Sequence, residues 1–204
     1  MSEILAIGDL ALAVDRAAEK IEAGVPVALP TDTVYVLAGD PTDPGVTDRL
    51  FHLKHRSRAY DLSVLVGSID QAMELTTAVP AAAKLLMERF WPGALTLVLP
   101  RNPDEPLDLG DDDVTIGLRL ANHPVPSALC LEVGPLAATP AGVQGEVVFE
   151  TAEEVAAEFG AWVPLILDGG RCGGAAATVV DVTGEEPRLL REGALAWADI
   201  ESAL

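Results

Sequence analysis

The sequence predicts one α/β domain with a mixed sheet, spanning residues 1–204. Segments with the helical spacing of apolar residues alternate along the chain with short apolar runs, and this interleaving is typical of α/β and mixed-sheet folds. Half of the 204 residues are apolar, which is enough for one ordinary core. No repeat, linker or low-complexity block divides the chain.

Capping residues and apolar runs define the elements of the first half. Asp9 can cap a helix that ends at Gly24, and the apolar run 25–29 indicates a buried strand. A polar turn follows at 31–35. Pro44 suits a first helical position and begins the next helix. The other expected elements are a short strand through Ala38, a strand at 62–66, and helices at 69–75 and 80–90.

The second half begins with a strand at 94–99, after the turn at 91–93. Residues 102–113 are acidic and rich in Pro and Gly, which predicts a solvated loop. Thr151 and Glu154 have the spacing of a capping box, ahead of a helix that ends near Gly160. The other expected elements are strands at 114–120, 164–167, 177–182 and 187–190, and helices at 125–133 and from about Leu195.

The charge balance limits the possible partners. The formal net charge is −19, and a field of that sign repels nucleic acids and anionic membranes, although one local basic patch leaves RNA binding open. We see no signal peptide and no apolar run long enough to cross a membrane, so a cytoplasmic protein is expected. Cys130 and Cys172 are too few for a zinc site or disulfide framework, and we expect buried, reduced thiols and no protein-bound metal.

Two stretches are candidates for binding a small anion. Four of the 13 Lys and Arg residues fall within ten positions: Arg49, Lys54, Arg56 and Arg58. Complementing a helix dipole explains one or two of them, whereas guanidinium groups also hold phosphate or carboxylate. Thr31, Thr33 and Tyr35 follow the strand at 25–29, where they either bind a polar ligand or serve as ordinary strand formers.

Three further features have both a structural and a functional interpretation. Arg119 lies within an apolar strand, so it needs either an ion-pair partner or a ligand carboxylate. His123, beside Pro124, is either catalytic or, more commonly, a capping or turn residue. The glycine-rich loop 168–174 follows a strand and could place N–H groups on phosphate, but it lacks the Lys-Ser/Thr ending of a P-loop.

Several stretches, in order, resemble the YrdC-type threonylcarbamoyl-AMP synthases. The matching segments lie at 30–35, 53–56 (similar to a K-x-R motif), 90–98, 117–119 with 123–124, 134–138, 168–170, 178–181 and 190–193. Together they cover nearly the whole chain. The resemblance implies a twisted open sheet flanked by helices, with a concave, cationic cavity.

The resemblance also implies a reaction. Threonine and bicarbonate form a carbamate that attacks the α-phosphate of ATP, releasing pyrophosphate and threonylcarbamoyl-AMP for tRNA modification, with Mg²⁺ bridging the phosphates. Lys54 and Arg56 would be the catalytic pair. The substrate would contact Thr31, Thr33, Tyr35, Arg119 and Thr178, with Arg119 on the threonine carboxylate. The nucleotide would contact Lys54, Arg56, Arg58, Thr139 and Arg191.

The chain departs from the family pattern at five places, and its loop after residues 168–170 is also one residue shorter than that pattern. Pro140 and Gly142 stand where an S-x-N motif is expected, Ala177 replaces a serine and Val36 replaces a glycine. At the fifth, Tyr60-Asp61 replaces a Lys-Pro pair that follows K-x-R. An altered or weak synthase is therefore one hypothesis, and a non-catalytic protein binding a nucleotide or structured RNA at the Lys54–Arg58 patch is another. A homodimer is also possible.

Overall fold

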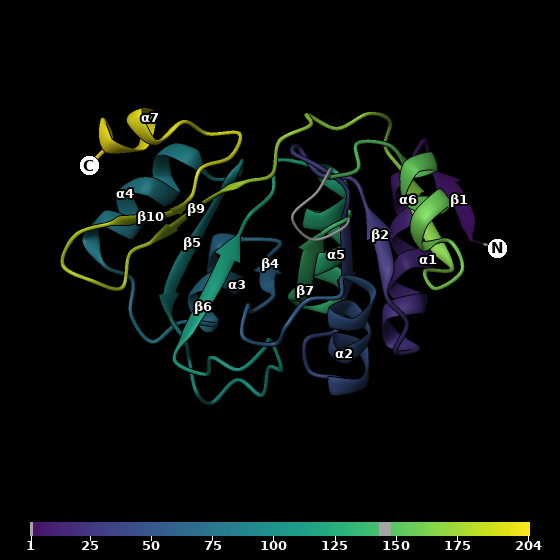
Figure 1. Ribbon diagram of the computed structural model, residues 1–204, viewed down its shortest axis with the longest axis horizontal. Helices are drawn as coiled ribbons and strands as arrows, with labels where there is room; N and C mark the ends of the chain where they lie inside the picture. Colours follow the sequence, from purple (N-terminus) through teal and green to yellow (C-terminus); the bar gives the residue numbers. More distant parts are fainter. Residues whose placement is uncertain (1, 143–147) are drawn as a thin grey trace.

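The computed structural model describes residues 2–142 and 148–204, and within them it confirms the α/β class (Figure 1). The helices are α1 (Leu10–Glu22), α2 (Pro44–Leu53), α3 (Ile69–Glu74), α4 (Ala81–Phe90), α5 (Pro124–Val133), α6 (Ala152–Phe159) and α7 (Trp197–Glu201). The strands are β1 (Glu3–Ala6), β2 (Val27–Leu29), β3 (Val36–Gly39), β4 (Ser63–Leu65), β5 (Leu95–Pro100), β6 (Thr115–Arg119), β7 (Leu136–Pro140), β8 (Leu165–Asp168), β9 (Thr178–Asp181) and β10 (Arg188–Arg191).

The strands form a mixed, ten-stranded open sheet in the order β1-β8-β2-β3-β7-β4-β6-β5-β9-β10. The pairs β1/β8, β2/β8, β4/β6 and β5/β9 are parallel, and the other neighbours are antiparallel. The sheet runs the length of the molecule, with the two chain ends at opposite extremes (Figure 1). Among the described residues, no helix is long and apolar enough to span a bilayer.

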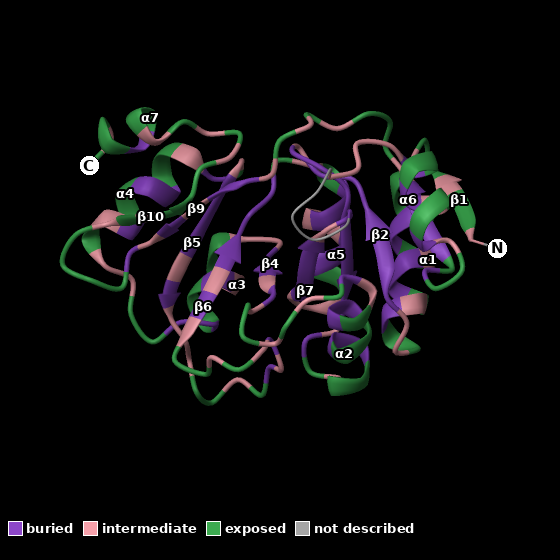
Figure 2. Ribbon diagram, in the orientation of Figure 1, coloured by how far each residue is buried: buried purple, intermediate pink, exposed green. Residues whose placement is uncertain are grey.

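Two apolar cores result from the alternation of side chains across the sheet. In β2, Val27 and Leu29 pack with α1 and α5, whereas Ala28 between them belongs to the larger core. The larger core includes side chains of α2, α4 and α6, among them Leu50, Leu86 and Phe159. Strands β2 and β3 are therefore buried along their whole length, and most residues of β4, β6 and β7 are buried too (Figure 2).

Two strands were not predicted, and each has a local reason. In β1 three of four residues are exposed, so its sequence shows no buried stripe, and only its parallel pairing with β8 makes it a strand. In β7 the sequence Leu-Ala-Ala-Thr-Pro is poor in β-branched residues and ends at Pro140, although its first four residues are buried between β3 and β4.

The capping predictions are confirmed. The Asp9 side chain accepts from the Leu12 amide, and Thr151 and Glu154 form both bonds of a capping box. Pro44 lies at the start of α2, whose N-cap is Asp43. The cysteine prediction is confirmed only for Cys130, which is fully buried, because Cys172 is half-buried; both thiols are free.

Candidate functional site

A cavity of about 430 Å³ lies over the half of the sheet formed by β4, β5, β6 and β9. A smaller pocket of about 40 Å³ adjoins this cavity. The two share several lining residues, including Ser63, Thr96, Pro140 and Arg191. In β5, Thr96 and Val98 face this space, whereas the alternate residues Leu95, Leu97 and Leu99 belong to the larger core. Strand periodicity therefore places a row of polar or small side chains on the cavity floor.

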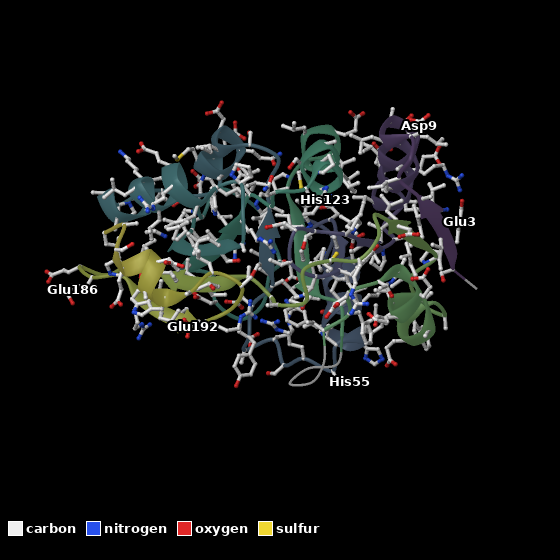
Figure 3. The ribbon with its side chains drawn as sticks, turned by 90° about the horizontal axis from the view of Figure 1, so that it is seen from above. Glu3, Asp9, His55, His123, Glu186 and Glu192 are labelled. Carbon is white, nitrogen blue, oxygen red and sulfur yellow. The ribbon has the colours of Figure 1, made fainter. Side chains whose placement is uncertain are left out.

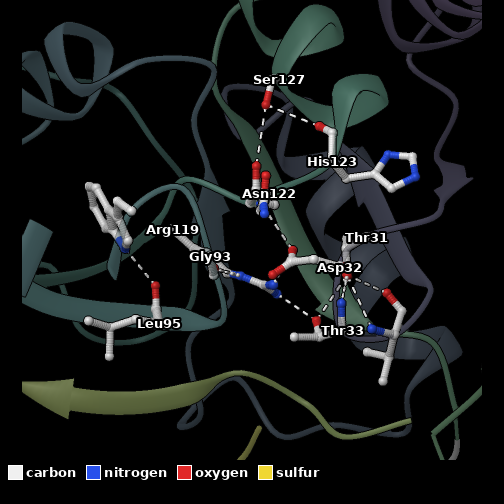
Figure 4. A network of polar contacts seen from close by, with 12 residues as sticks. Thr31, Asp32, Thr33, Gly93, Leu95, Arg119, Asn122, His123 and Ser127 are labelled. Atoms are coloured by element: carbon white, nitrogen blue, oxygen red, sulfur yellow. Dashed lines mark hydrogen bonds and ion pairs between the residues drawn. The ribbon is translucent and has the colours of Figure 1, made fainter. Parts of the chain in front are cut away.

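Arg119 ends β6 and is held at the edge of the smaller pocket by three partners (Figure 4). Its Nε donates to the Gly93 carbonyl at 3.0 Å, one terminal nitrogen donates to Thr33 Oγ1 at 2.9 Å, and the other to Asp32 Oδ1 at 2.7 Å. The residue is only 5% exposed. These contacts use three of the guanidinium N–H groups, so two remain for a ligand.

The Thr31–Tyr35 turn is arranged around the Thr31 hydroxyl. Thr31 Oγ1 donates to the Val34 carbonyl at 2.6 Å and accepts from the amides of Thr33 and Val34 at 3.1 Å. It also lies 2.9 Å from Thr33 Oγ1, which accepts from Arg119. Thr31 thus shapes the turn that aligns Thr33 with Arg119, and its own hydroxyl is already engaged.

Tyr35 is fully buried, and its hydroxyl forms hydrogen bonds with the backbone of the glycine-rich loop. It donates to the Gly170 carbonyl at 2.9 Å and accepts from the Gly169 amide at 3.1 Å. Burial raises the pKa of this phenol well above its ordinary value, so it stays protonated. Tyr35 is not itself among the residues that line the two parts of the cavity, and its position indicates a brace between two loops.

Three further cations converge on the cavity region and are held by backbone carbonyls. Lys54 Nζ donates to the Gly142 carbonyl, and Arg191 Nη2 donates to the Ala177 carbonyl at 2.9 Å. Arg56 donates from Nε to the Tyr60 carbonyl and from Nη2 to the Asp61 carbonyl, both at 2.7 Å. Within the described ranges, none of these three cations has a carboxylate oxygen within 4.0 Å.

These cations are close enough to lower one another's pKa values. Burial lowers the pKa of Lys54 to about 8, and the neighbouring Arg56 adds to the effect. Burial also lowers the pKa of Arg56, Arg119 and Arg191, and the charge of Arg191 contributes at the first two. Lys54 and Arg119 are buried, Arg56 is partly exposed and Arg191 is exposed. Among the described residues only Arg119 of these four has a paired carboxylate, Asp32, so a bound anion would stabilise the cluster.

Other predicted residues lie in different surroundings. Arg58 pairs with Asp48 at 2.6 Å and with Asp108, and it stacks on Phe51, so its charge is already balanced. The Thr178 hydroxyl donates to the Leu195 carbonyl at 2.5 Å and accepts two amides, which anchors the segment before α7. Thr139 borders the smaller pocket, and its buried hydroxyl has no hydrogen-bond partner among the described residues.

His123 is a helix cap, the commoner of its two sequence interpretations. Its Nδ1 accepts from the Val125 amide at 3.2 Å at the start of α5. Because burial lowers its pKa, the ring is neutral at pH 7 and carries its proton on Nε2. Figure 3 shows His55 at one edge of the molecule and His123 well apart from it, so these two histidines do not share a site.

The positions at which the sequence suggests departures from the family pattern lie at or beside this cavity. Pro140 borders both of its parts, and Val36 and Ala177 border the smaller pocket. Gly142 has a φ of 140°, which favours glycine, and its carbonyl accepts from Lys54. The last departure, Tyr60-Asp61, borders the larger part beside Arg56.

Three residues at or beside the cavity were not predicted from the sequence: Asp32, Ser63 and Thr96. Asp32 pairs with Arg119 across 87 positions and also accepts from the Asn122 amide at 3.1 Å. Ser63 and Thr96 are hydroxyl residues on neighbouring parts of the cavity floor. Ser63 and Thr96 could have been found from their positions in the strands. Each is a polar residue in an otherwise apolar strand, on the opposite face from the next residue, which is apolar.

Comparison with known proteins identifies the family. Residues 19–193 match the Sua5/YciO/YrdC family model, whose description is telomere recombination. The chain belongs to this family. A Mycobacterium tuberculosis relative is 39% identical over 185 residues, which cover 90% of this chain and 85% of the relative. The Bacillus subtilis threonylcarbamoyl-AMP synthase is 37% identical over 182 residues, which cover 87% of this chain but only 52% of that enzyme.

Solved structures agree with this assignment. The chain matches Pyrococcus abyssi Sua5 complexed with L-threonine with a TM-score of 0.84 and 33% identity, over 94% of this chain and 57% of Sua5. It matches Escherichia coli YciO with a TM-score of 0.87 and 25% identity, over 96% of this chain and 98% of YciO. The fold is thus that of the Sua5 and YciO proteins, and relatives named as synthases do not favour the non-catalytic alternative.

Proposed function

We propose that this protein is a threonylcarbamoyl-AMP synthase that uses threonine, bicarbonate and ATP. The observation that carries the proposal is the convergence of Lys54, Arg56, Arg119 and Arg191 near one cavity of an otherwise acidic chain. A nucleoside triphosphate and an amino-acid carboxylate are anions that such a cluster binds. Relatives named for this activity, and a relative structure titled as a threonine complex, support the choice of substrates.

In this proposal Arg119 receives the threonine carboxylate. Asp32, Thr33 and the Gly93 carbonyl fix three sides of its guanidinium group and leave two N–H groups for the substrate. Because the Arg119 side chain is already ordered in the folded protein, substrate binding loses no further conformational entropy from it. A carboxylate on Arg119 also offsets the repulsion between Arg119 and Arg191.

Chemistry follows in two balanced steps. The threonine amine attacks bicarbonate, and loss of water gives the carbamate. A carbamate oxygen then attacks the α-phosphorus of ATP, and the bond to the bridging oxygen breaks to release pyrophosphate. Lys54, Arg56 and Arg191 would stabilise the negative charge that grows on the departing pyrophosphate. Mg²⁺ enters with ATP as part of the substrate.

The cavity also suits the lability of the product. An acyl phosphate anhydride is hydrolysed by water, and the apolar side chains of Val98, Ile116, Val179 and Leu190 on one side of the cavity offer no group that could activate a water molecule. The proposed product would then leave for transfer to tRNA by a separate acceptor reaction.

Pyrophosphate release tests the proposal. We expect release from ATP that requires both threonine and bicarbonate, and its loss in Arg56→Ala and Arg119→Ala. Arg89→Ala is the matched control, because it removes one positive charge from helix α4, outside the cavity lining. Release that does not depend on threonine, or a full rate in Arg119→Ala, would refute the assignment.

A further inference from the structure

The mouth of the cavity carries an aromatic ring that the proposed reaction does not yet use. Tyr60 borders the cavity together with Arg56, and 61% of its surface is exposed. The other tyrosine of the chain, Tyr35, is fully buried. Tyr60 also stands where the family pattern has a lysine, so a charged group is replaced by a flat ring at this position.

The backbone beneath this ring is firmly held. Arg56 donates to the carbonyls of both Tyr60 and Asp61 at 2.7 Å, and the Tyr60 amide donates to the Ser57 carbonyl at 3.1 Å. On the other side, the Leu62 amide donates to the Leu109 carbonyl at 2.7 Å. These contacts fix the backbone of the loop while the Tyr60 side chain stays largely exposed, which is the arrangement expected of a preorganised contact surface.

The same guanidinium group links the ring to the proposed phosphate site. Because Arg56 contacts the Tyr60 carbonyl directly, a phosphate bound by Arg56 brings the rest of its nucleotide close to the Tyr60 ring. Polar residues such as Ser63 and Thr96 line other parts of the cavity, but Tyr60 is the one aromatic residue among the described residues that line it. Stacking is the interaction that an aromatic ring offers to a nucleobase.

We propose that Tyr60 is the residue on which the adenine ring of ATP stacks. The inference rests on the proposed function, since it takes the Arg56 end of the cavity as the phosphate site. Tyr60 contributes affinity for the base, and the cations contribute affinity for the phosphates. Since stacking does not read base edges, GTP gains the same contact as ATP.

Binding of ATP and of inorganic tripolyphosphate, measured by calorimetry, separates the two contributions. We expect Tyr60→Ala to weaken ATP about tenfold or more, equivalent to about 1.4 kcal/mol, because base stacking is lost. Tripolyphosphate lacks a base, so its affinity for Tyr60→Ala should equal that for the unmodified protein. Tyr60→Phe keeps the ring and should bind ATP as the unmodified protein does.

Each other outcome has a definite meaning. Equal ATP affinity in Tyr60→Ala and the unmodified protein overturns the stacking inference and leaves the synthase proposal intact. An equal loss in Tyr60→Ala and Tyr60→Phe overturns it too, because the hydroxyl would then be the contact. If the unmodified protein binds neither ATP nor tripolyphosphate, the proposed function fails and the inference fails with it. Retained tripolyphosphate binding also shows that Tyr60→Ala is folded.

Discussion

The lowered pKa of Lys54 predicts a specific pH dependence of ATP binding. Burial and the charge of Arg56 lower this pKa from 10.5 to about 8 in the free protein. A bound triphosphate favours the charged form and raises the pKa again. Below pH 8 the lysine is already protonated, so affinity should be constant there. Above pH 8 binding must first protonate the lysine, and affinity should fall by about tenfold for one further pH unit.

Calorimetric titration of ATP between pH 7 and pH 9 measures this dependence. The lower limit of about pH 7 avoids most of the titration of the terminal phosphate, whose pKa is near that of other phosphate monoesters at about 6. Lys54→Arg is the matched control, because a guanidinium group stays charged throughout. A flat wild-type profile up to pH 9, or an equal slope in Lys54→Arg, would refute the assignment of this titration to Lys54.

Three further predictions concern single contacts. Asp32→Asn removes the carboxylate partner of Arg119, so KM for threonine should rise while ATP affinity, measured by calorimetry, stays nearly unchanged. Thr178→Val leaves buried amides unpaired and should lower the free energy of unfolding in urea by about 1–3 kcal/mol, whereas Thr178→Ser should not. Gly39→Ala places a Cβ 2.3 Å from an α2 side chain and should cost about 1–3 kcal/mol in the same assay; Gly8→Ala, with nothing within 4 Å, is its control.

The fold class and most elements were predictable from the sequence because their signals are local. Capping residues such as Asp9 and Thr151 act within one turn, and apolar alternation reports burial directly. No local sequence signal of this kind specifies the order of the strands in the sheet. β7 lies between β3 and β4, far earlier in the chain, and its identity as a strand depends on those two partners.

The sequence indicated which Lys and Arg residues were candidates for the site, but it did not indicate which carboxylates pair with them. An arginine in an apolar strand needs a counter-charge, and this requirement predicted a partner for Arg119 without naming Asp32, 87 positions away. In the same way the sequence did not indicate the partners of Arg58, which lies near other cations in the sequence and pairs with Asp48 and Asp108 in the structure. A cluster of cationic residues in the sequence therefore does not show how many of them lack a carboxylate partner in the folded protein.

The contacts that position the cations explain how this cavity accommodates an altered motif. Lys54 is held by the carbonyl of Gly142, Arg191 by that of Ala177, and Arg119 in part by that of Gly93. A backbone carbonyl accepts the same hydrogen bond whichever side chain its residue carries, provided that the backbone conformation is kept. A substitution at 177 therefore changes a wall of the smaller pocket and leaves the carbonyl that holds Arg191 in place. The carbonyl that holds Lys54, by contrast, depends on Gly142 itself, whose φ of 140° favours glycine. Binding of the phosphate chain should accordingly be more tolerant of these departures than recognition of the rest of the nucleotide, to which Tyr60 makes its contribution.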